Sequence, residues 1–316
     1  MKLPELKIGK LTARLPIVQG GMAIRVSTAR LAAAVGEEGG IGIIAASGMT
    51  PDELRYEIRL ARSLTKHGII GINMMVAGRS FNTMVHTAIE EGIDLVIAGA
   101  GFSRDMFGMG QESNTPIVPI VSTSKLAKIS EALGASAVVV EGKEAGGHLG
   151  TDRSMTEIVP EVRAAVKIPV IGAGGVLYGR DIVEAIKLGA NGVQMGIRFA
   201  ASEESNAAPA LKEFYLKARP EDVVLIPSPV GLPGRAVRNP YAEKILDGTV
   251  AKPETCDACL KHCKQNFCII KALIRAQQGD VETGLVFTGE YVHKIDRIMS
   301  VKEIMTELVR EAEEID

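Results

Sequence analysis

His148 is the side chain whose setting best suits acid–base chemistry. It ends the glycine-rich segment Glu141-Gly-Lys-Glu-Ala-Gly-Gly-His148, which follows the apolar run 138–140. A single histidine is more often a structural residue than a catalyst, but imidazole titrates near neutral pH and this one lies on a loop directly after an apolar strand. We therefore expect His148 to act as an acid, a base or a substrate anchor. The histidines that lack this setting are His67, His86, His262 and His293.

Two glycine turns, each after an apolar run, have the composition of a phosphate-binding loop. Residues 168–171 lead into Gly172-Ala-Gly-Gly175, and residues 192–195 stop at Gly196. Glycine lets bare backbone N–H groups approach an anion. The candidate phosphate ligands are Ala173, Gly174, Gly175, Gln194, Met195 and Gly196.

Two further segments could contact a flat ring. Gln19-Gly-Gly-Met22 and Gly71-Ile-Asn-Met-Met75 both lie at the end of an apolar run. A glycine such as Gly21 lets a ring approach the backbone, while Met22 offers a soft apolar surface and an amide N–H. Asn73 can both donate to and accept from a pyrimidine-like edge. The alternative is that Met22 only fills the core, the commoner fate of methionine.

A scaffold must bring these segments together, and the chain pattern indicates which one. Eight β-rich runs alternate with stretches in which apolar residues recur every three or four positions. In about two hundred residues this pattern favours a closed (β/α)8 barrel, a TIM barrel of the α/β class, over an open sheet. The expected strands are 16–19, 41–45, 69–74, 95–98, 117–121, 137–140, 169–172 and 192–195, and the expected helices are 27–35, 50–64, 82–91, 104–111 (short or irregular), 125–133, 155–166 and 180–188. Because all strands point one way, the segments above meet at one rim, and the turns after strands seven and eight form the phosphate cradle.

The pattern changes after residue 200. Residues 200–217 read as a helix, residues 223–238 are rich in proline and glycine, and Ser300 introduces an amphipathic helix over 301–314. We therefore expect a phosphate-binding barrel domain over 1–200 and a mostly helical extension over 201–316. Because the extension continues from the eighth strand, we expect it to cover the mouth of the barrel.

Composition narrows the partners. The chain has 316 residues, 46% hydrophobic content and a net charge of -2, so it can bury a large core and has no signature of polyanion binding. No apolar run approaches the roughly 18 residues of a membrane span, and the start lacks a signal core. We expect a cytoplasmic protein that acts on a small molecule, with no nucleic-acid or membrane partner, and we leave a homodimer open.

All four cysteines lie in one short segment, Cys256-x2-Cys259-x3-Cys263-x4-Cys268. In a chain without a signal peptide such clustering favours a metal over disulfides. Four thiolates suit an iron–sulfur cluster or tetrahedral zinc, and reduced, packed cysteines without metal are the third reading.

The motifs together resemble the FMN-dependent nitronate monooxygenases, once called 2-nitropropane dioxygenases, and the related FMN-dependent enoyl-acyl-carrier-protein reductases. The resemblance covers about residues 15–204. It rests on Pro16-Ile-Val-Gln-Gly-Gly-Met22, Glu141-Gly-x-Glu-Ala-Gly-Gly-His148, the Gly-Ala-Gly-Gly turn and Gln194-Met-Gly-x-Arg-Phe199, in that order.

The resemblance implies an FMN-dependent oxidoreductase with His148 as its catalytic residue. It implies that Gly21, Met22 and Asn73 lie against the flavin ring, Gly146 and Gly147 beside the ribityl chain, Glu141 as a polar ligand, and Ala173, Gly174, Gly175, Gln194, Met195 and Gly196 around the phosphate. Oxidation of alkyl nitronates to carbonyl compounds and nitrite is the first reading. Reduction of an enoyl thioester with NAD(P)H as the reductant is the second, because both reactions use one flavin site and one histidine.

Two readings from other classes use the same features. A flavin-free isomerase or synthase of sugar phosphates would use the same cradle, although such enzymes normally place lysines or carboxylates where glycines dominate here. A non-catalytic flavin or metal sensor would signal through the cysteine segment.

Overall fold

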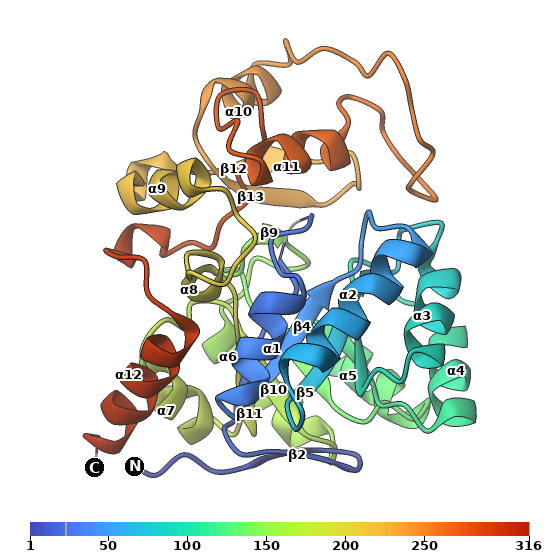
Figure 1. Ribbon diagram of the computed structural model, residues 1–316, viewed down its shortest axis with the longest axis vertical. Coiled ribbons are helices and arrows are strands. Elements are labelled where there is room, and N and C mark those ends of the chain that lie inside the picture. The colour runs from blue at the N-terminus through green and yellow to red at the C-terminus, as the bar shows by residue number, and fades with distance from the viewer. Residues whose placement is uncertain (23, 316) are drawn as a thin grey trace.

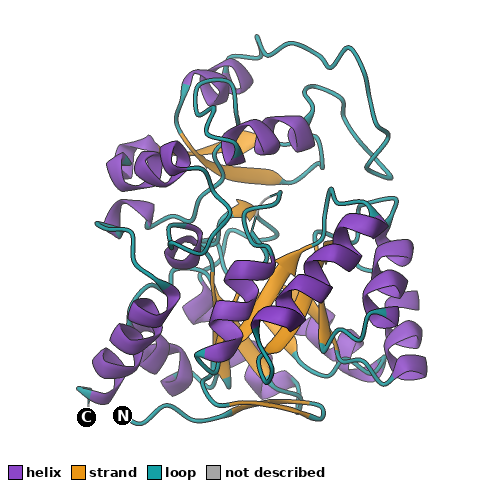
Figure 2. Cartoon of the chain, in the orientation of Figure 1, coloured by secondary structure: helices purple, strands orange, loops and turns teal. Residues whose placement is uncertain are grey.

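A closed barrel of eight parallel strands forms the centre of the molecule (Figures 1 and 2). The structure is a computed structural model and describes residues 1–22 and 24–315. The barrel strands are β3 (Ile17–Gln19), β4 (Ile41–Ala45), β5 (Ile69–Met75), β6 (Leu95–Gly99), β7 (Ile117–Val121), β8 (Val138–Glu141), β10 (Val170–Ala173) and β11 (Gly192–Met195). Around the barrel they follow in chain order, and β11 closes the ring on β3. The expected TIM barrel is confirmed, and its strand ends share one rim.

Helices form the outer layer of the barrel, and local capping begins several of them where the sequence indicates. Thr50 accepts from the Glu53 N–H while the Glu53 carboxylate accepts from the Thr50 N–H, and Pro51 takes the first helical position. The helices after the first seven strands are α1 (Ala29–Glu37), α2 (Pro51–Leu64), α3 (Phe81–Glu90), α4 (Asp105–Ser113), α5 (Ser124–Ala132), α6 (Met155–Ala165) and α7 (Gly179–Lys187).

The final helix, α12 (Val301–Glu313), belongs to this outer layer. The Ser300 side chain caps it as the sequence predicts, and the helix packs against both α7 and α1. The Glu311 carboxylate accepts from the Gly179 N–H at 2.6 Å. The last part of the chain therefore completes the ring of helices instead of covering the mouth, while a domain boundary near residue 200 stays a prediction.

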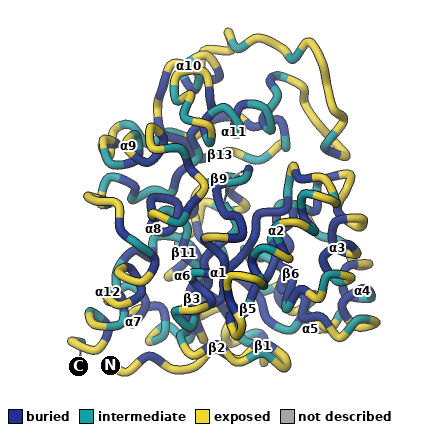
Figure 3. The backbone as a smooth tube through the Cα atoms, in the orientation of Figure 1, coloured by how far each residue is buried: buried dark blue, intermediate teal, exposed yellow. Residues whose placement is uncertain are grey.

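Apolar side chains from alternate strand positions fill the barrel, and the barrel strands are mostly buried (Figure 3). Ile43, Ile97 and Val139 belong to this buried interior cluster. A short antiparallel hairpin, β1 (Leu6–Ile8) and β2 (Leu11–Ala13), adds Leu6 and Ile8 to the same cluster. The hairpin lies at the barrel end opposite the extension (Figure 1), and the sequence analysis did not predict it.

The rest of the extension lies over the carboxyl ends of the strands (Figure 1). It contains α8 (Ile197–Ala200), α9 (Pro209–Lys217), a 3-10 turn at Pro220–Asp222, β12 (Val223–Pro227), β13 (Pro233–Val237), α10 (Pro240–Leu246), α11 (Ile269–Gln277) and a 3-10 turn at Val292–Lys294. The expected helix over 200–217 is wrong in its first half, because Pro209 starts a new helix that residues 201–208 do not join. The hairpin of β12 and β13 was not predicted either. No helix of the described residues is both long enough and apolar enough to cross a bilayer.

Close approach of α1 to the barrel gives a test of the fold. A Cβ added to Gly42 in β4 would lie 1.9 Å from the carbonyl oxygen of Ala32 in α1. Gly42→Ala must therefore displace α1, and we expect it to lower the free energy of unfolding by about 1–3 kcal/mol or more. A urea denaturation midpoint measures this loss.

Gly108 in α4 is the matched control, because nothing lies within 4 Å of its Cβ position. Gly108→Ala should raise stability by up to about 1 kcal/mol through helix propensity. Equal effects of the two substitutions would contradict the packing argument.

Candidate active site

A deep cavity opens between the rim of the barrel and α11. Its volume is about 270 Å³, close to the lower end of the roughly 300–1,000 Å³ of most small-molecule sites. The predicted residues that line it are Gly21, Met22, Asn73, Glu141, Gly146, Gly147, His148, Ala173, Gly174, Gly175, Gln194 and Gly196.

Met195 is the predicted ligand that does not line the cavity. Its side chain is 1% exposed and belongs to the core cluster between the barrel and its helices. Its carbonyl oxygen accepts from the Gly20 N–H at 2.9 Å. Alternation along β11 explains the difference, because Gln194 and Met195 point to opposite faces of the strand.

The turn after β10 has the backbone geometry of an anion cradle. Gly174 has φ +108° and Gly175 has φ +77°, conformations that side-chain-bearing residues rarely adopt. A Cβ on Gly175 would also lie 3.1 Å from the Tyr291 ring. The turn thus needs glycine twice, and both glycines line the cavity.

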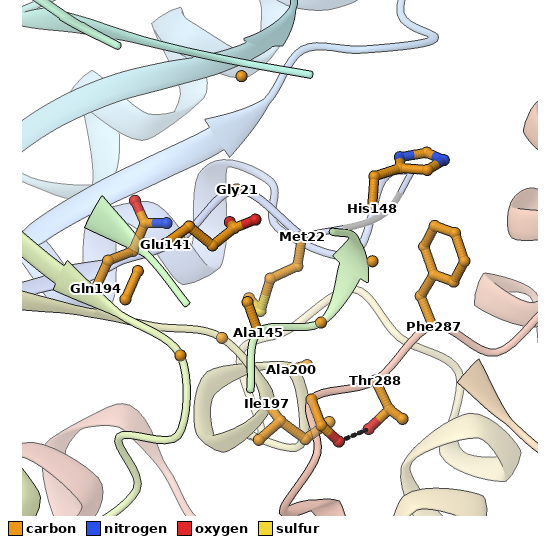
Figure 4. A pocket seen from close by; sticks show the side chains of 18 of the residues that line it. Gly21, Met22, Glu141, Ala145, His148, Gln194, Ile197, Ala200, Phe287 and Thr288 are labelled. Atoms are coloured by element: carbon orange, nitrogen blue, oxygen red, sulfur yellow. Dashed lines mark hydrogen bonds between the residues drawn. The ribbon is translucent and has the colours of Figure 1, made fainter. Parts of the chain in front are cut away.

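Gln194 supplies the clearest sign that a bound group belongs in the cavity. Its Oε1 is buried and has no hydrogen-bond partner among the described residues. An unpaired buried oxygen costs about 1–3 kcal/mol, which a donor on a bound molecule would offset. Gln194 lies near Glu141 at the base of the cavity (Figure 4).

Gly21 and Asn73 are packed against each other, which explains why position 21 has no side chain. A Cβ on Gly21 would lie 2.3 Å from the Cβ of Asn73. The expectation that the Met22 amide is free to bind a ring is wrong, because this N–H donates to Ser27 Oγ at 2.9 Å. Met22 therefore offers the cavity its apolar side chain, as Figure 4 shows.

His148 is held at the mouth by parts of the extension. It lies on β9 (Gly147–His148), which pairs with β13, and its Nε2 is 2.8 Å from Ser228 Oγ. The Phe287 ring meets the imidazole edge to face at 5.2 Å (Figure 4). Burial lowers the pKa of His148 to about 4, so the imidazole is neutral at pH 7.

The pKa of Glu141 is shifted in the opposite direction, and burial is again the cause. Its carboxyl group lines the cavity at the end of β8, and burial raises its pKa to about 8. At pH 7 the group is mostly protonated and can donate a hydrogen bond.

Arg235 ties the catalytic loop to the extension. The arginine is 8% exposed, and its Nε donates to the Ala145 carbonyl at 3.2 Å while its Nη2 donates to the Lys143 carbonyl. A buried guanidinium with these partners orders the loop that ends at His148. The sequence analysis did not identify Arg235.

The extension supplies the apolar wall of the cavity, which sequence reasoning also missed. Its residues are Ile269, Ile270 and Leu273 of α11, Phe287, and Tyr215 of α9, facing Ile24 and Val26 of the barrel. The only sequence signal was that the extension follows the eighth strand directly.

The four cysteines do not form the metal site expected of Cys256, Cys259, Cys263 and Cys268. Residues 251–265 are mostly exposed (Figure 3), and this stretch joins the barrel through a bridge between Leu260 and Gly78. In the part of the chain that is described, no group of three or more His, Cys, Asp or Glu side chains is placed to hold a metal ion. The structure therefore does not support zinc or an iron–sulfur cluster.

Comparisons with known proteins identify the family of this chain. The family model described as nitronate monooxygenase matches residues 4–311. A 5-hydroxy-7a-methyl-1-oxo-octahydro-1H-indene-4-carboxyl-CoA dehydrogenase of Mycobacterium tuberculosis is 34% identical over 240 residues, covering 75% of this chain and 67% of that protein.

Two solved structures share nearly the whole fold. FabK from Thermotoga maritima is 37% identical with a TM-score of 0.86, covering 95% of this chain and 93% of that one. A nitroalkane oxidase from Streptomyces ansochromogenes is 26% identical with a TM-score of 0.82, covering 96% of each chain. The chain belongs to the nitronate monooxygenase family and is an FMN-dependent oxidoreductase.

Proposed function

We propose that this enzyme reduces an α,β-unsaturated acyl thioester, with NAD(P)H as the reductant. One observation carries the proposal: no lysine or arginine lines the cavity among the described residues, whereas Glu141, Glu144 and Glu290 do. A nitronate is an anion, and these side chains offer it no opposite charge. The motifs alone favour nitronate oxidation, and the electrostatics of the cavity reverse that preference.

The neutral state of His148 strengthens this argument. An imidazole whose pKa lies near 4 offers an anion no positive charge at pH 7. A neutral imidazole can still donate its N–H to a carbonyl oxygen and stabilise the negative charge that develops there. A thioester carbonyl is such an acceptor, and it is uncharged when it binds.

The apolar wall fits the rest of such a substrate. Ile269, Ile270 and Leu273 of α11 cover the mouth on the side of Ile24, and they exclude water from the space above the rim. A hydrocarbon chain gains roughly 0.8 kcal/mol for each methylene buried there. A small nitroalkane would leave most of this surface uncovered.

The residues present fit FMN. The glycine turn at Gly174 and Gly175 suits its phosphate, and the protonated Glu141 suits the polar edge of its ring. The unpaired Gln194 oxygen was expected near the phosphate, but it can only accept a hydrogen bond and therefore suits a donor on the ring. When bound, FMN supplies hydride transfer, which no amino-acid side chain provides. This chain's own contribution is to hold the phosphate, exclude water and donate a hydrogen bond from His148.

Nitronate oxidation is the second candidate. The family model and the likeness to a nitroalkane oxidase favour it, and His148 would then bind the nitro group or remove an α-proton. The two reactions leave different products, so one set of assays separates them.

Assays on FMN-loaded protein can compare the two reactions directly. We expect crotonyl-CoA to stimulate NADH oxidation, and propionate 3-nitronate to release little or no nitrite. His148→Asn should lower kcat for the thioester roughly 10²- to 10⁴-fold while the bound-flavin spectrum stays unchanged. Nitrite release without thioester-dependent NADH loss would select the second candidate.

The phosphate cradle gives the next prediction. Gly175→Ala places a side chain at φ +77° and 3.1 Å from Tyr291, so the turn must shift its amides. We expect the FMN dissociation constant to rise at least about tenfold, which corresponds to roughly 1.4 kcal/mol, in a flavin-fluorescence titration.

Gly248→Ala is the control, because Gly248 has φ +72° but nothing within 4 Å of its Cβ position. It carries the same backbone strain far from the cradle. A similar loss of FMN affinity in both variants would show that strain alone is responsible.

Glu141 gives a pH-dependent prediction for protein stripped of FMN. Its pKa is about 8 in the folded protein, against the ordinary 4.5 of an exposed glutamate, so between these values ionisation favours the unfolded state and stability falls as pH rises. Glu141→Gln removes this loss of stability, which is on the order of 1.4 kcal/mol for each pH unit between the two pKa values. We expect the Tm advantage of the variant to grow from pH 5 to pH 8; an advantage equal at both pH values contradicts the burial of Glu141.

A further inference from the structure

The position of His148 depends on a sheet that crosses from the barrel to the extension. His148 of β9 is opposite Gly234 of β13, and Gly147 is opposite Arg235. β13 in turn pairs with β12 along its whole length. The backbone of the catalytic histidine is therefore the third strand of a sheet that the extension provides.

Ser228 follows β12 and makes the one hydrogen bond that the His148 ring has with the described residues. Ser228 is 2% exposed. Its Oγ accepts the Val230 N–H at 3.3 Å, and the described residues offer its hydroxyl proton no other acceptor than His148 Nε2. A buried O–H without an acceptor is costly, so the hydroxyl donates and Nε2 accepts.

This direction decides which ring nitrogen carries the proton. A neutral imidazole has one N–H, and when Nε2 accepts, the proton is on Nδ1. Nδ1 has no hydrogen bond with the described residues and is not among the buried atoms without a partner, so it is accessible, and His148 lines the cavity. The Phe287 ring at 85° to the imidazole restricts its rotation.

We propose that Ser228 is a positioning residue that holds His148 in the Nδ1-protonated tautomer and so presents Nδ1–H to the cavity. The role of that N–H toward a thioester carbonyl rests on the proposed function. The tautomer itself does not, because it follows from the contacts of His148 alone.

Long-range ¹H–¹⁵N spectra of histidine-labelled, FMN-loaded protein test the tautomer directly. The His148 signals are those missing from His148→Asn. We expect the wild-type protein to show protonated Nδ1 and unprotonated Nε2, and Ser228→Ala to shift the population toward Nε2–H. A wild-type ring with its proton on Nε2 would overturn the proposal, as would an unchanged tautomer in Ser228→Ala.

Kinetics then separate positioning from a general structural effect. In Ser228→Ala, kcat should fall roughly 10- to 100-fold, the range typical for groups that orient a functional histidine, with KM for the substrate little changed. Ser228→Thr keeps the hydroxyl and should restore the Nδ1–H signal.

Ser130→Ala is the matched control, because Ser130 is fully buried in α5 and donates to the Leu126 carbonyl away from the cavity. It should leave both the His148 spectrum and kcat unchanged. If neither candidate substrate turns over but the spectra are as expected, the proposed function fails and the role of Ser228 stands.

Discussion

The pairing of β9 with β13 is the interaction on which the active site depends. A barrel rim alone would leave His148 on a glycine-rich loop, free to adopt many conformations. Two backbone pairings with β13, together with the buried Arg235 below the loop, remove that freedom. His148 is thus ordered by residues more than eighty positions further along the chain. The extension therefore fixes the position of a residue that lines the cavity, and does more than cover it.

A second constraint is electrostatic. The cavity is deep, bordered by apolar side chains, and without lysine or arginine among its described lining residues. In such surroundings the charged forms of ionisable groups are unfavourable, so burial lowers the pKa of His148 and raises that of Glu141. Both groups are then uncharged near neutral pH and act as hydrogen-bond donors. Backbone amides, which carry no titratable charge, are the groups that could offer positive potential to an anion in such a cavity.

The two halves of the chain differ in how far local pattern predicts them. Barrel strands such as β4 and β7 were predicted to the residue, because a run of β-branched residues buried on both faces needs no distant partner to be recognised. The β1–β2 hairpin and the β12–β13 hairpin were missed. The strands of the first pair have only three residues each, and prolines and a glycine interrupt the second pair, so the pairing of both depends on the surfaces that they meet.

By itself the sequence determined which residues of the barrel rim line the cavity, because parallel strands must end at one rim and glycine motifs mark the turns there. Met195 lies elsewhere, since side chains alternate along a strand. Only the tertiary structure decided the partner of His148, the protonation of Glu141 and the apolar wall of α11. These depend on distances between segments that lie far apart along the chain, and neither spacing nor composition encodes such distances locally. The cysteine segment shows the converse, because close spacing in sequence did not produce a metal-binding arrangement in the described chain.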